Sequence, residues 1–288
     1  MTVLVTGSRG RVGSTLLTLL HGKGVPVRAA SASPAGLAAP AGVDTVRCDL
    51  GAPETFPAAL DGVEAVFLYA DPRHIDAFIA EARTAGVRHI VLLSSSAVLS
   101  PDAGANAIAA PHLAVERALA AASADGSFDV TYLQPGAFAT NALYWAPAVR
   151  SAGAVDLPYP DAVGDPIHEA DIADVAYAAL TDDRVRGSSH VLTGPEALTF
   201  AEQLAILGRV AGREVTVNAV TPEEWKASVA PYVPAEFADA LLAHWSACAA
   251  APVPLTRTVE EVTGRPARTF AQWAADHAEA FDGTAPVK

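Results

Sequence analysis

Residues 2 to 6 form a short apolar strand that leads directly into a glycine-rich turn and then into a helix-forming segment. The turn carries Gly7, Gly10 and Gly13. In a strand–turn–helix unit, glycines at this spacing permit the tight turn, the approach of the backbone to a diphosphate and the close packing of helix on strand. Ordinary turns and helix caps also collect glycine, so the spacing needs support from its context. With that support, it predicts a parallel α/β fold that binds a dinucleotide at the amino end of its first helix.

The distribution of charge provides this support. The sequence has a formal net charge of −13, yet no Asp or Glu precedes Asp44. The same stretch holds Arg9, Arg11, Lys23 and Arg28, four basic residues against no acidic one, so its local charge is +4. A basic segment in an acidic chain suits a small anionic cofactor. The remaining sequence has no basic stripe, which argues against a nucleic-acid partner.

The end of the second strand-like run, Val25 to Ala30, indicates which dinucleotide is bound. An NAD-selective site places a carboxylate there for the ribose 2′-hydroxyl. This chain has Ser31 instead, and Arg9 and Arg28 are the nearest charges. Without a carboxylate to repel a 2′-phosphate, we predict that NADPH is preferred over NADH. The alternative is that these arginines are solvated surface charges.

The composition is that of a large globular domain, or of a domain with a smaller appendage, because 51% of the 288 residues are hydrophobic. Cys48 and Cys248 lie far apart, which favours free thiols in a reducing compartment. The apolar first strand has no basic segment before it, and no apolar run reaches the roughly 20 residues that a bilayer requires. We therefore expect a cytoplasmic protein without a membrane partner. The sequence leaves the oligomeric state open.

Strand-like and helical segments alternate over the first half of the chain. The strand-like runs are Val3 to Thr6, Val25 to Ala30, Asp44 to Arg47, Ala65 to Tyr69, His89 to Leu93 and Val130 to Leu133. Such alternation predicts right-handed crossovers and a parallel sheet. Two of the runs are almost continuously apolar, as expected for strands that helices cover on both faces. The expected fold class is α/β, a Rossmann-type doubly wound parallel sheet.

The C-terminal third has a different pattern, which is dominated by helix starts. In each of four capping boxes, a Thr is followed three residues later by Glu or Gln, so that the two side chains satisfy free amides. The four threonines are Thr199, Thr221, Thr258 and Thr269. We expect an NADP-binding Rossmann domain at residues 1–155, with residues 165–195 returning to it. Residues 196–288 are expected to form a smaller, mostly helical cap that binds substrate.

Longer segments follow one another in an order that is more specific than any one of them. They are residues 5–13 (VTGSRGRVG), 48–50 (CDL), 85–96 (AGVRHIVLLSSS), 112–116 (HLAVE), 133–138 (LQPGAF) with Asn141, a segment that starts at Asp171, and 192–200 (LTGPEALTF). This order resembles the atypical short-chain dehydrogenase/reductases of the NmrA-like group over almost the entire chain. That group includes triphenylmethane reductase, quinone reductases and polyketide ketoreductases that lack the usual tyrosine.

The resemblance implies roles for the matching residues. The turn Gly7-Ser8-Arg9-Gly10-Arg11-Val12-Gly13 would hold the pyrophosphate, and Asp49 and Leu50 would approach the adenine. The nicotinamide end would be lined by Tyr69, Ala70, Ser94, Ser95, Ser96 and the turn Pro135-Gly136-Ala137-Phe138.

Two positions depart from the group's pattern. Gln134 stands where an Arg often precedes Pro-Gly, and Ala32 replaces an Arg near the end of the second strand. The second departure weakens the preference for NADP and moves its expected contact onto Arg9, Arg11 and Arg28.

The expected proton donor differs from that of the standard superfamily. Standard members of the superfamily use a Tyr with a Lys four residues later, which lowers the pKa of the Tyr. Here no Tyr has such a Lys, and His112 and Glu116 occupy the corresponding helix positions. Residues four apart share a helix face, so Glu116 is expected to orient the imidazole and favour its charged form. Three hypotheses remain open for His112: a general acid, a ligand of the nicotinamide ribose, or a structural histidine near a helix start.

Ser96 follows the fifth strand-like run and matches the serine that polarises the substrate in the superfamily, with Ser95 as its rival. A hydroxyl there is suited to holding a carbonyl oxygen during hydride attack, although strand-end serines are also common structural caps. If no side chain donates the proton, a water molecule or an acidic hydroxyl of the substrate supplies it.

The expected wall of the substrate pocket combines aromatic and polar side chains. These are Phe138, Asn141, Tyr144, Trp145 and His168. Aromatic residues at such positions also occur as plain core. The acidic run after His168 is better explained by Asp171 as the N-cap of a helix than by a metal, and we expect no metal site.

Together these patterns predict an NADPH-dependent reductase that transfers hydride to a ketone or quinone carbonyl of a bulky aromatic substrate. A ketoreductase of polyketide tailoring is one concrete version. The alternatives are a non-catalytic NADP(H)-binding redox sensor that acts through a protein partner, and an epimerase or dehydratase with tightly held cofactor.

Overall fold

The structure is a computed structural model that describes residues 1–251 and 253–282. Contacts divide it into two compact units, which are described separately. Unit 1 comprises Met1–Pro135, Glu169–Leu192 and Thr258–Arg265, and unit 2 comprises Gly136–His168, Thr193–Arg257 and the chain from Pro266 onward. Within the described ranges, no helix has the length and apolarity needed to cross a bilayer.

Unit 1 contains a seven-stranded parallel sheet with the order β3-β2-β1-β4-β5-β6-β9. The strands are β1 (Val3–Val5), β2 (Val27–Ser31), β3 (Asp44–Arg47), β4 (Ala65–Tyr69), β5 (His89–Leu93), β6 (Asp129–Pro135) and β9 (Ser189–Leu192). This arrangement confirms the predicted Rossmann-type sheet. The strand order reverses between β1 and β4, which is where ligands of open α/β sheets bind at the carboxyl ends of the strands.

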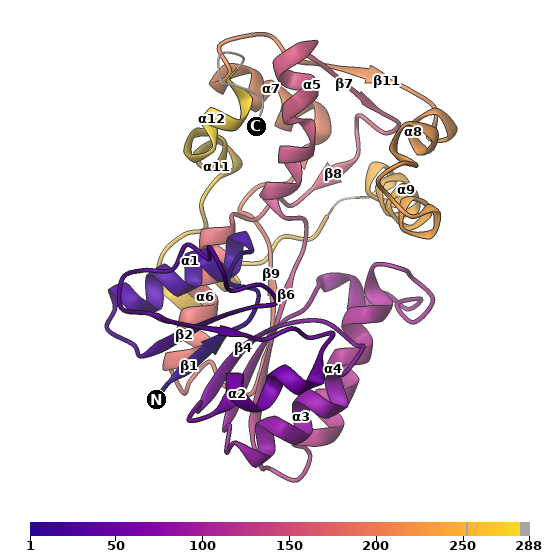
Figure 1. Cartoon of the computed structure of the whole chain (residues 1–288). Coiled ribbons are helices and arrows are strands. Elements are labelled where there is room, and N and C mark those ends of the chain that lie inside the picture. Colours follow the sequence, from indigo (N-terminus) through magenta and orange to yellow (C-terminus); the bar gives the residue numbers. More distant parts are fainter. Residues whose placement is uncertain (252, 283–288) are drawn as a thin grey trace. The chain divides into compact units, whose positions relative to one another are not determined.

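Helices cover both faces of this sheet (Figure 1). One face carries α2 (Phe56–Leu60), α3 (Ile75–Thr84) and α4 (Ala109–Ser123), whose buried side chains share a core with strand residues such as Leu4 and Leu92. The other face carries α1 (Arg11–Gly22) and α6 (Glu169–Thr181), which contact each other, and α10 (Thr258–Thr263) packs on α6. Burial on both faces explains the unbroken apolar runs of β4 and β5. Two short 3-10 helices, η1 (Pro53–Thr55) and η2 (Ser96–Leu99), complete the unit.

Unit 2 is mostly helical and contains two small sheets. Its elements are η3 (Ala139–Trp145), α5 (Ala146–Ser151), β7 (Ala154–Leu157), β8 (Val163–Gly164), β10 (Leu198–Thr199), α7 (Phe200–Val210), β11 (Thr216–Ala219), α8 (Pro222–Val229), α9 (Ala235–Ala250), α11 (Phe270–Asp276) and α12 (Ala278–Phe281). β7 pairs with β11 and β8 pairs with β10, so residues 136–168 group with the C-terminal region. A core around the fully buried Trp273 holds the unit together.

The helix starts follow the capping chemistry in three of four cases. Thr199, Thr221 and Thr269 each accept a hydrogen bond from the third helical amide, and the Glu or Gln there accepts one in return. Thr258 is itself the first residue of α10. The expectation that Asp171 caps a helix is wrong, because α6 already begins at Glu169 and Asp171 lies inside its first turn.

A buried carboxylate shapes the turn that follows β6. The Asp165 Oδ1 atom accepts a hydrogen bond from the Ala137 amide at 2.9 Å, and the Asp165 carbonyl accepts one from Gly194 at 3.0 Å. A Cβ atom on Gly136 would lie 2.0 Å from the Asp165 Oδ2 atom, so glycine is required there. Burial raises the pKa of the Asp165 carboxyl to about 6, although the amide hydrogen bond opposes this shift.

The packing of α1 on the end of β1 is as close as the approach of Gly136 to Asp165. A Cβ atom on Gly13 would lie 2.5 Å from the Gly7 carbonyl oxygen, a backbone atom that cannot move aside. We expect Gly13→Ala to lower the free energy of unfolding by about 1 to 3 kcal/mol. Gly22→Ala, in the same helix and with nothing within 4 Å of its added Cβ, is the matched control. It should leave stability unchanged or raise it by up to about 1 kcal/mol. Urea denaturation measures both, and equal midpoints for the two variants would contradict this packing.

Asp165 should make stability depend on pH. Its pKa of about 6 in the folded protein exceeds the ordinary value of 3.8, so the folded state binds this proton more tightly than the unfolded chain. The stabilisation is therefore complete below about pH 4 and is lost as the pH rises through about 6, with a total of about 3 kcal/mol. Asp165→Asn is neutral throughout and should remove this decline in denaturation series from about pH 4 to about pH 7. Asp183→Asn, at an exposed carboxylate, is the control and should keep the wild-type slope, and a slope unchanged in Asp165→Asn would refute the assignment.

Candidate functional site

The loop between β1 and α1 is held by backbone geometry and by one inward-facing serine. Gly7 has a φ of 60°, which glycine adopts without strain. The Ser8 hydroxyl donates to the Val5 carbonyl at 2.7 Å and accepts from the Ala30 amide at 3.2 Å, so it links the loop to β2. Ser8 is only 1% exposed, and its amide also donates to the Ala30 carbonyl at 3.0 Å, so Ser8 fixes the loop rather than contacting a ligand.

The first turn of α1 has the features of an anion site and no acidic residue. Gly10 is its N-cap, no acidic residue lies in its first turn, and Arg11 is exposed at the first helical position. Free amides at a helix start and the positive end of the helix dipole favour a bound phosphate. The predicted turn from Gly7 to Gly13 therefore has the local structure that a diphosphate requires.

Tyr69 lies against this loop, whereas the resemblance placed it at the nicotinamide end. Its hydroxyl accepts a hydrogen bond from the Gly13 amide at 3.2 Å. A Cβ atom on Gly7 would lie 2.6 Å from the Tyr69 ring, and one on Gly10 would lie 2.9 Å from the Tyr69 hydroxyl oxygen. Burial raises the pKa of Tyr69, so the phenol keeps a proton that it can donate to an anion. No pattern in the sequence connected Tyr69 with the glycine turn, because they lie more than fifty residues apart.

The two arginines expected at the cofactor phosphate lie in different places. Arg9 is exposed and donates to the carbonyls of Ser33 and Ala35, beyond the end of β2, at 2.6 and 2.5 Å. Arg28, near the start of β2, donates instead to the carbonyls of Ala59 and Asp61 at 3.0 and 2.7 Å. The structure thus brings Arg9, but not Arg28, to the strand end where a 2′-phosphate is expected.

The other residues expected around the adenosine half have mainly local contacts. Ser31 ends β2 and is 7% exposed, and its hydroxyl accepts a hydrogen bond from the Ser33 amide at 3.3 Å. Asp49 accepts a hydrogen bond from the Gly51 amide at 2.9 Å, and Leu50 packs on the core beside it. Ala70, after β4, also packs on this core.

A hydrogen-bonded cluster occupies the carboxyl ends of β5 and β6. The Ser94 hydroxyl donates to the Glu116 Oε1 atom at 2.5 Å, and the Gln134 amide donates to the same oxygen at 3.0 Å. Ser94 is 3% exposed and Gln134 is 4% exposed. Gln134 replaces the Arg of the resembled group, and this contact with Glu116 was not expected from the sequence.

The serines after Ser94 have different roles. Ser95 is the N-cap of η2, and its hydroxyl accepts the Ala97 amide at 3.2 Å, which is the structural use of a strand-end serine. Ser96 is the first residue of η2 and is half-buried. Of the two proposed polarising residues, Ser96 therefore has the hydroxyl that is not part of the cap.

The expected pairing of His112 with Glu116 is wrong. The Glu116 carboxylate accepts from Ser94 and Gln134 instead. Among the described residues, the buried His112 Nδ1 atom has no hydrogen-bond partner, and burial lowers the pKa of His112. The imidazole is therefore neutral near pH 7, where it can donate one N–H but carries no charge.

The residues expected at the substrate belong to unit 2. Asn141 and Tyr144 are exposed, and 86% of Tyr144 is accessible. Trp145 packs edge-on against Phe200, with ring centroids 5.6 Å apart. His168 is 4% exposed and lies 3.3 Å from an Asp276 carboxylate oxygen, which is typical of a structural histidine. Phe138 and Gly136 lie in the turn after β6, and Pro135 ends that strand.

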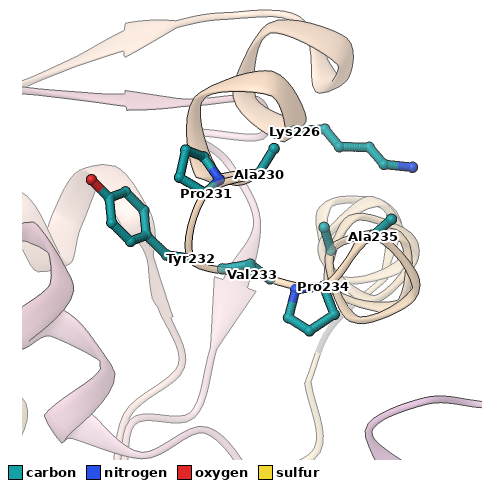
Figure 2. Close-up of a pocket in the computed structure, with 8 residues that line it drawn as sticks. Lys226, Ala230, Pro231, Tyr232, Val233, Pro234 and Ala235 are labelled. Atoms are coloured by element: carbon teal, nitrogen blue, oxygen red, sulfur yellow. The ribbon is translucent and has the colours of Figure 1, made fainter.

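A surface hollow of about 400 Å³ lies between α8 and α9. Figure 2 shows that Lys226 and Tyr232 extend in opposite directions from it, and Lys226 forms an ion pair with Asp239 of α9. None of the residues predicted for the site lines this hollow.

Comparison of the sequence with known proteins shows which family it belongs to. The NAD(P)H-binding family matches residues 7–183. The chain is 38% identical to a (4-alkanoyl-5-oxo-2,5-dihydrofuran-3-yl)methyl phosphate reductase of Streptomyces griseus, over 97% of this chain and 99% of that one. It is 35% identical to an NAD(P)H azoreductase of Xenophilus azovorans, again over 97% and 99%.

A solved structure agrees with this result. The NADPH-dependent quinone oxidoreductase QOR2 of Escherichia coli superposes with a TM-score of 0.79 at 25% identity, over 96% of this chain and 99% of that one. The predicted resemblance to the atypical, NmrA-like dehydrogenase/reductases is therefore confirmed. The chain belongs to the NAD(P)H-binding family, and it is an NAD(P)H-dependent oxidoreductase.

Proposed function

We propose that this protein is an NADPH-dependent reductase that transfers hydride to the carbonyl carbon of a bulky ketone or quinone. The observation that carries the proposal is the first turn of α1, which combines free amides, no carboxylate, and Arg9 and Tyr69 close by. The relatives support it, since their names describe reductions of an oxo-dihydrofuran phosphate, an azo compound and a quinone.

The residues around the glycine loop would each bind a different part of the cofactor. The amides of Arg11 and Val12 would face the diphosphate, and the Tyr69 hydroxyl would donate a hydrogen bond to the same anion. Arg9 binds the 2′-phosphate from its place beside residues 33–35. When bound, NADPH supplies the hydride, and the protein supplies position and charge.

The proton for the carbonyl oxygen has to come from a source other than a Tyr-Lys pair. Ser96 would hold the carbonyl oxygen through its hydroxyl, and the neutral His112 has at most one N–H to donate. A water molecule or an acidic hydroxyl of the substrate then completes the reaction. Quinones suit this arrangement because their reduced oxygen is a weakly basic phenolate, and phenolic ketones suit it because their acidic hydroxyl can supply the proton.

The substrate is proposed to be bulky and aromatic. Asn141, Tyr144 and Trp145 remain the proposed contacts, and Tyr144 has an aromatic face that is open to a ligand. His168 is less suited to a substrate contact because it is buried beside Asp276.

Turnover and cofactor choice test the proposal together. Purified protein should oxidise NADPH in the presence of at least one member of a panel of quinones and aromatic ketones. Arg9→Ala should raise the KM for NADPH by about 10-fold or more, with little change for NADH, because one charged contact to phosphate is lost. Arg117→Ala, an exposed arginine of α4, is the control. No oxidation of NADPH across the panel would refute the reductase, and equal effects on both cofactors would refute the role of Arg9.

Tyr69→Phe tests the cofactor loop by a different route. The variant keeps the ring that packs on Gly7 and loses the hydroxyl that pairs with the Gly13 amide. We expect the Kd for NADPH to rise by about 10-fold or more, as for the loss of one hydrogen bond to a charged group. Calorimetry measures the Kd, and Tyr232→Phe, at a tyrosine that is 86% exposed, should bind as the wild type does. An unchanged Kd in Tyr69→Phe would remove Tyr69 from the site.

A further inference from the structure

The Glu116 carboxylate stands out in unit 1 because it is hydrogen-bonded but not neutralised. Its Oε1 atom accepts from two neutral donors, Ser94 and Gln134. Within residues 1–251 and 253–282, no Lys, Arg or His forms an ion pair with Glu116. A carboxylate in a partly buried place usually has a cationic partner, since its removal from water is costly.

The charge of Glu116 affects the pKa of a neighbouring tyrosine. Burial and the negative charge of Glu116 together raise the pKa of Tyr132 on β6 to about 12. Of the basic residues on the same helix, Arg117 is exposed and burial lowers the pKa of His112, and neither forms an ion pair with Glu116 in the described part of the chain. The cluster therefore holds a carboxylate without a cationic partner among the described residues.

The position of Glu116 in unit 1 indicates which part of the cofactor it would face, an inference that rests on the proposed function. Ser94 directly follows β5, and Gln134 is the second-last residue of β6, so the cluster lies at the carboxyl ends of these strands. A dinucleotide that starts on the glycine loop after β1 extends along the carboxyl ends toward the strands beyond the switch point. In the order β1-β4-β5-β6, that direction places its nicotinamide half over β5 and β6.

We propose that Glu116 is the counter-charge of the oxidised nicotinamide. As hydride leaves with its two electrons for the carbonyl carbon, the ring that was neutral acquires one positive charge. A fixed carboxylate nearby stabilises this charge as it develops. The standard superfamily uses a Lys four residues after the Tyr, so this chain has a group of the opposite charge at the corresponding position.

The hydrogen bonds of the cluster add a positioning role. Because the Ser94 hydroxyl donates a hydrogen bond to Glu116, its oxygen can act toward any further partner only as an acceptor. Such an acceptor suits the amide N–H₂ of a carboxamide. Glu116 therefore contributes charge directly and orientation through Ser94.

The test compares the affinities of NADP⁺ and NADPH by calorimetry. Glu116→Gln keeps the shape and an acceptor for Ser94 and removes only the charge. We expect the Kd of NADP⁺ to rise by about 10-fold relative to that of NADPH, because only the oxidised ring is cationic. Glu54→Gln, an exposed carboxylate of η1, changes the net charge equally and should leave the ratio of the two Kd values unchanged.

Two further variants separate charge from structure. Ser94→Ala removes the hydrogen bond and keeps the charge, so it should weaken both forms without altering their ratio. Glu116→Ala removes the charge without relying on the glutamine geometry and should reproduce the ratio of Glu116→Gln. If Glu116→Gln does not fold, the comparison is made with Glu116→Ala. A folded variant without the charge that keeps the wild-type ratio of the two Kd values would refute the role of Glu116 as a counter-charge. Wild-type protein that binds neither form would overturn the proposed function, and with it this inference.

Discussion

The close approach between the end of β1 and the start of α1 is the constraint on which the candidate site depends. Gly13 brings the helix within contact of the Gly7 carbonyl, and this contact aims the first-turn amides at the switch point of the sheet. The other two glycines are required for a different reason, since the Tyr69 side chain occupies the space where their Cβ atoms would be. One aromatic residue from β4 thus shapes the anion site together with three glycines.

The charges around the sheet edge follow the charges of the cofactor. Arg9 and Arg11 lie at the glycine loop, where phosphates are expected. Glu116 lies at the ends of β5 and β6, where the proposed counter-charge would face a ring that becomes cationic. A site with this polarity would bind the cofactor in one direction and would favour hydride donation.

The chemistry proposed here uses few reactive side chains. Ser95 serves as a helix cap, and the burial of Cys48 raises the pKa of its thiol to about 12, which keeps it protonated and unreactive. Both cysteines are free, as predicted. The protein would therefore contribute mainly the position of the cofactor and the electrostatics of the strand ends, while the substrate or water supplies the proton.

Local patterns in the sequence were sufficient for the elements of the fold. The runs at residues 65–69 and 89–93 are the strands β4 and β5 of the structure, because a strand buried on both faces has to be apolar throughout. The run at residues 44–47 is β3, a mostly exposed strand at the edge of the sheet. Three capping boxes likewise mark real helix starts, since capping depends only on residues a few positions apart.

The sequence by itself determined the parallel sheet, the glycine loop, the family and the absence of a Tyr-Lys pair. The tertiary structure decided which side chains meet: Tyr69 with the glycine loop, Glu116 with Ser94 and Gln134 rather than His112, and Arg28 with the carbonyls of Ala59 and Asp61. These partners are separated by 18 to 56 residues. Only the strand order and the helix packing bring them together, so no local spacing rule predicts their contacts.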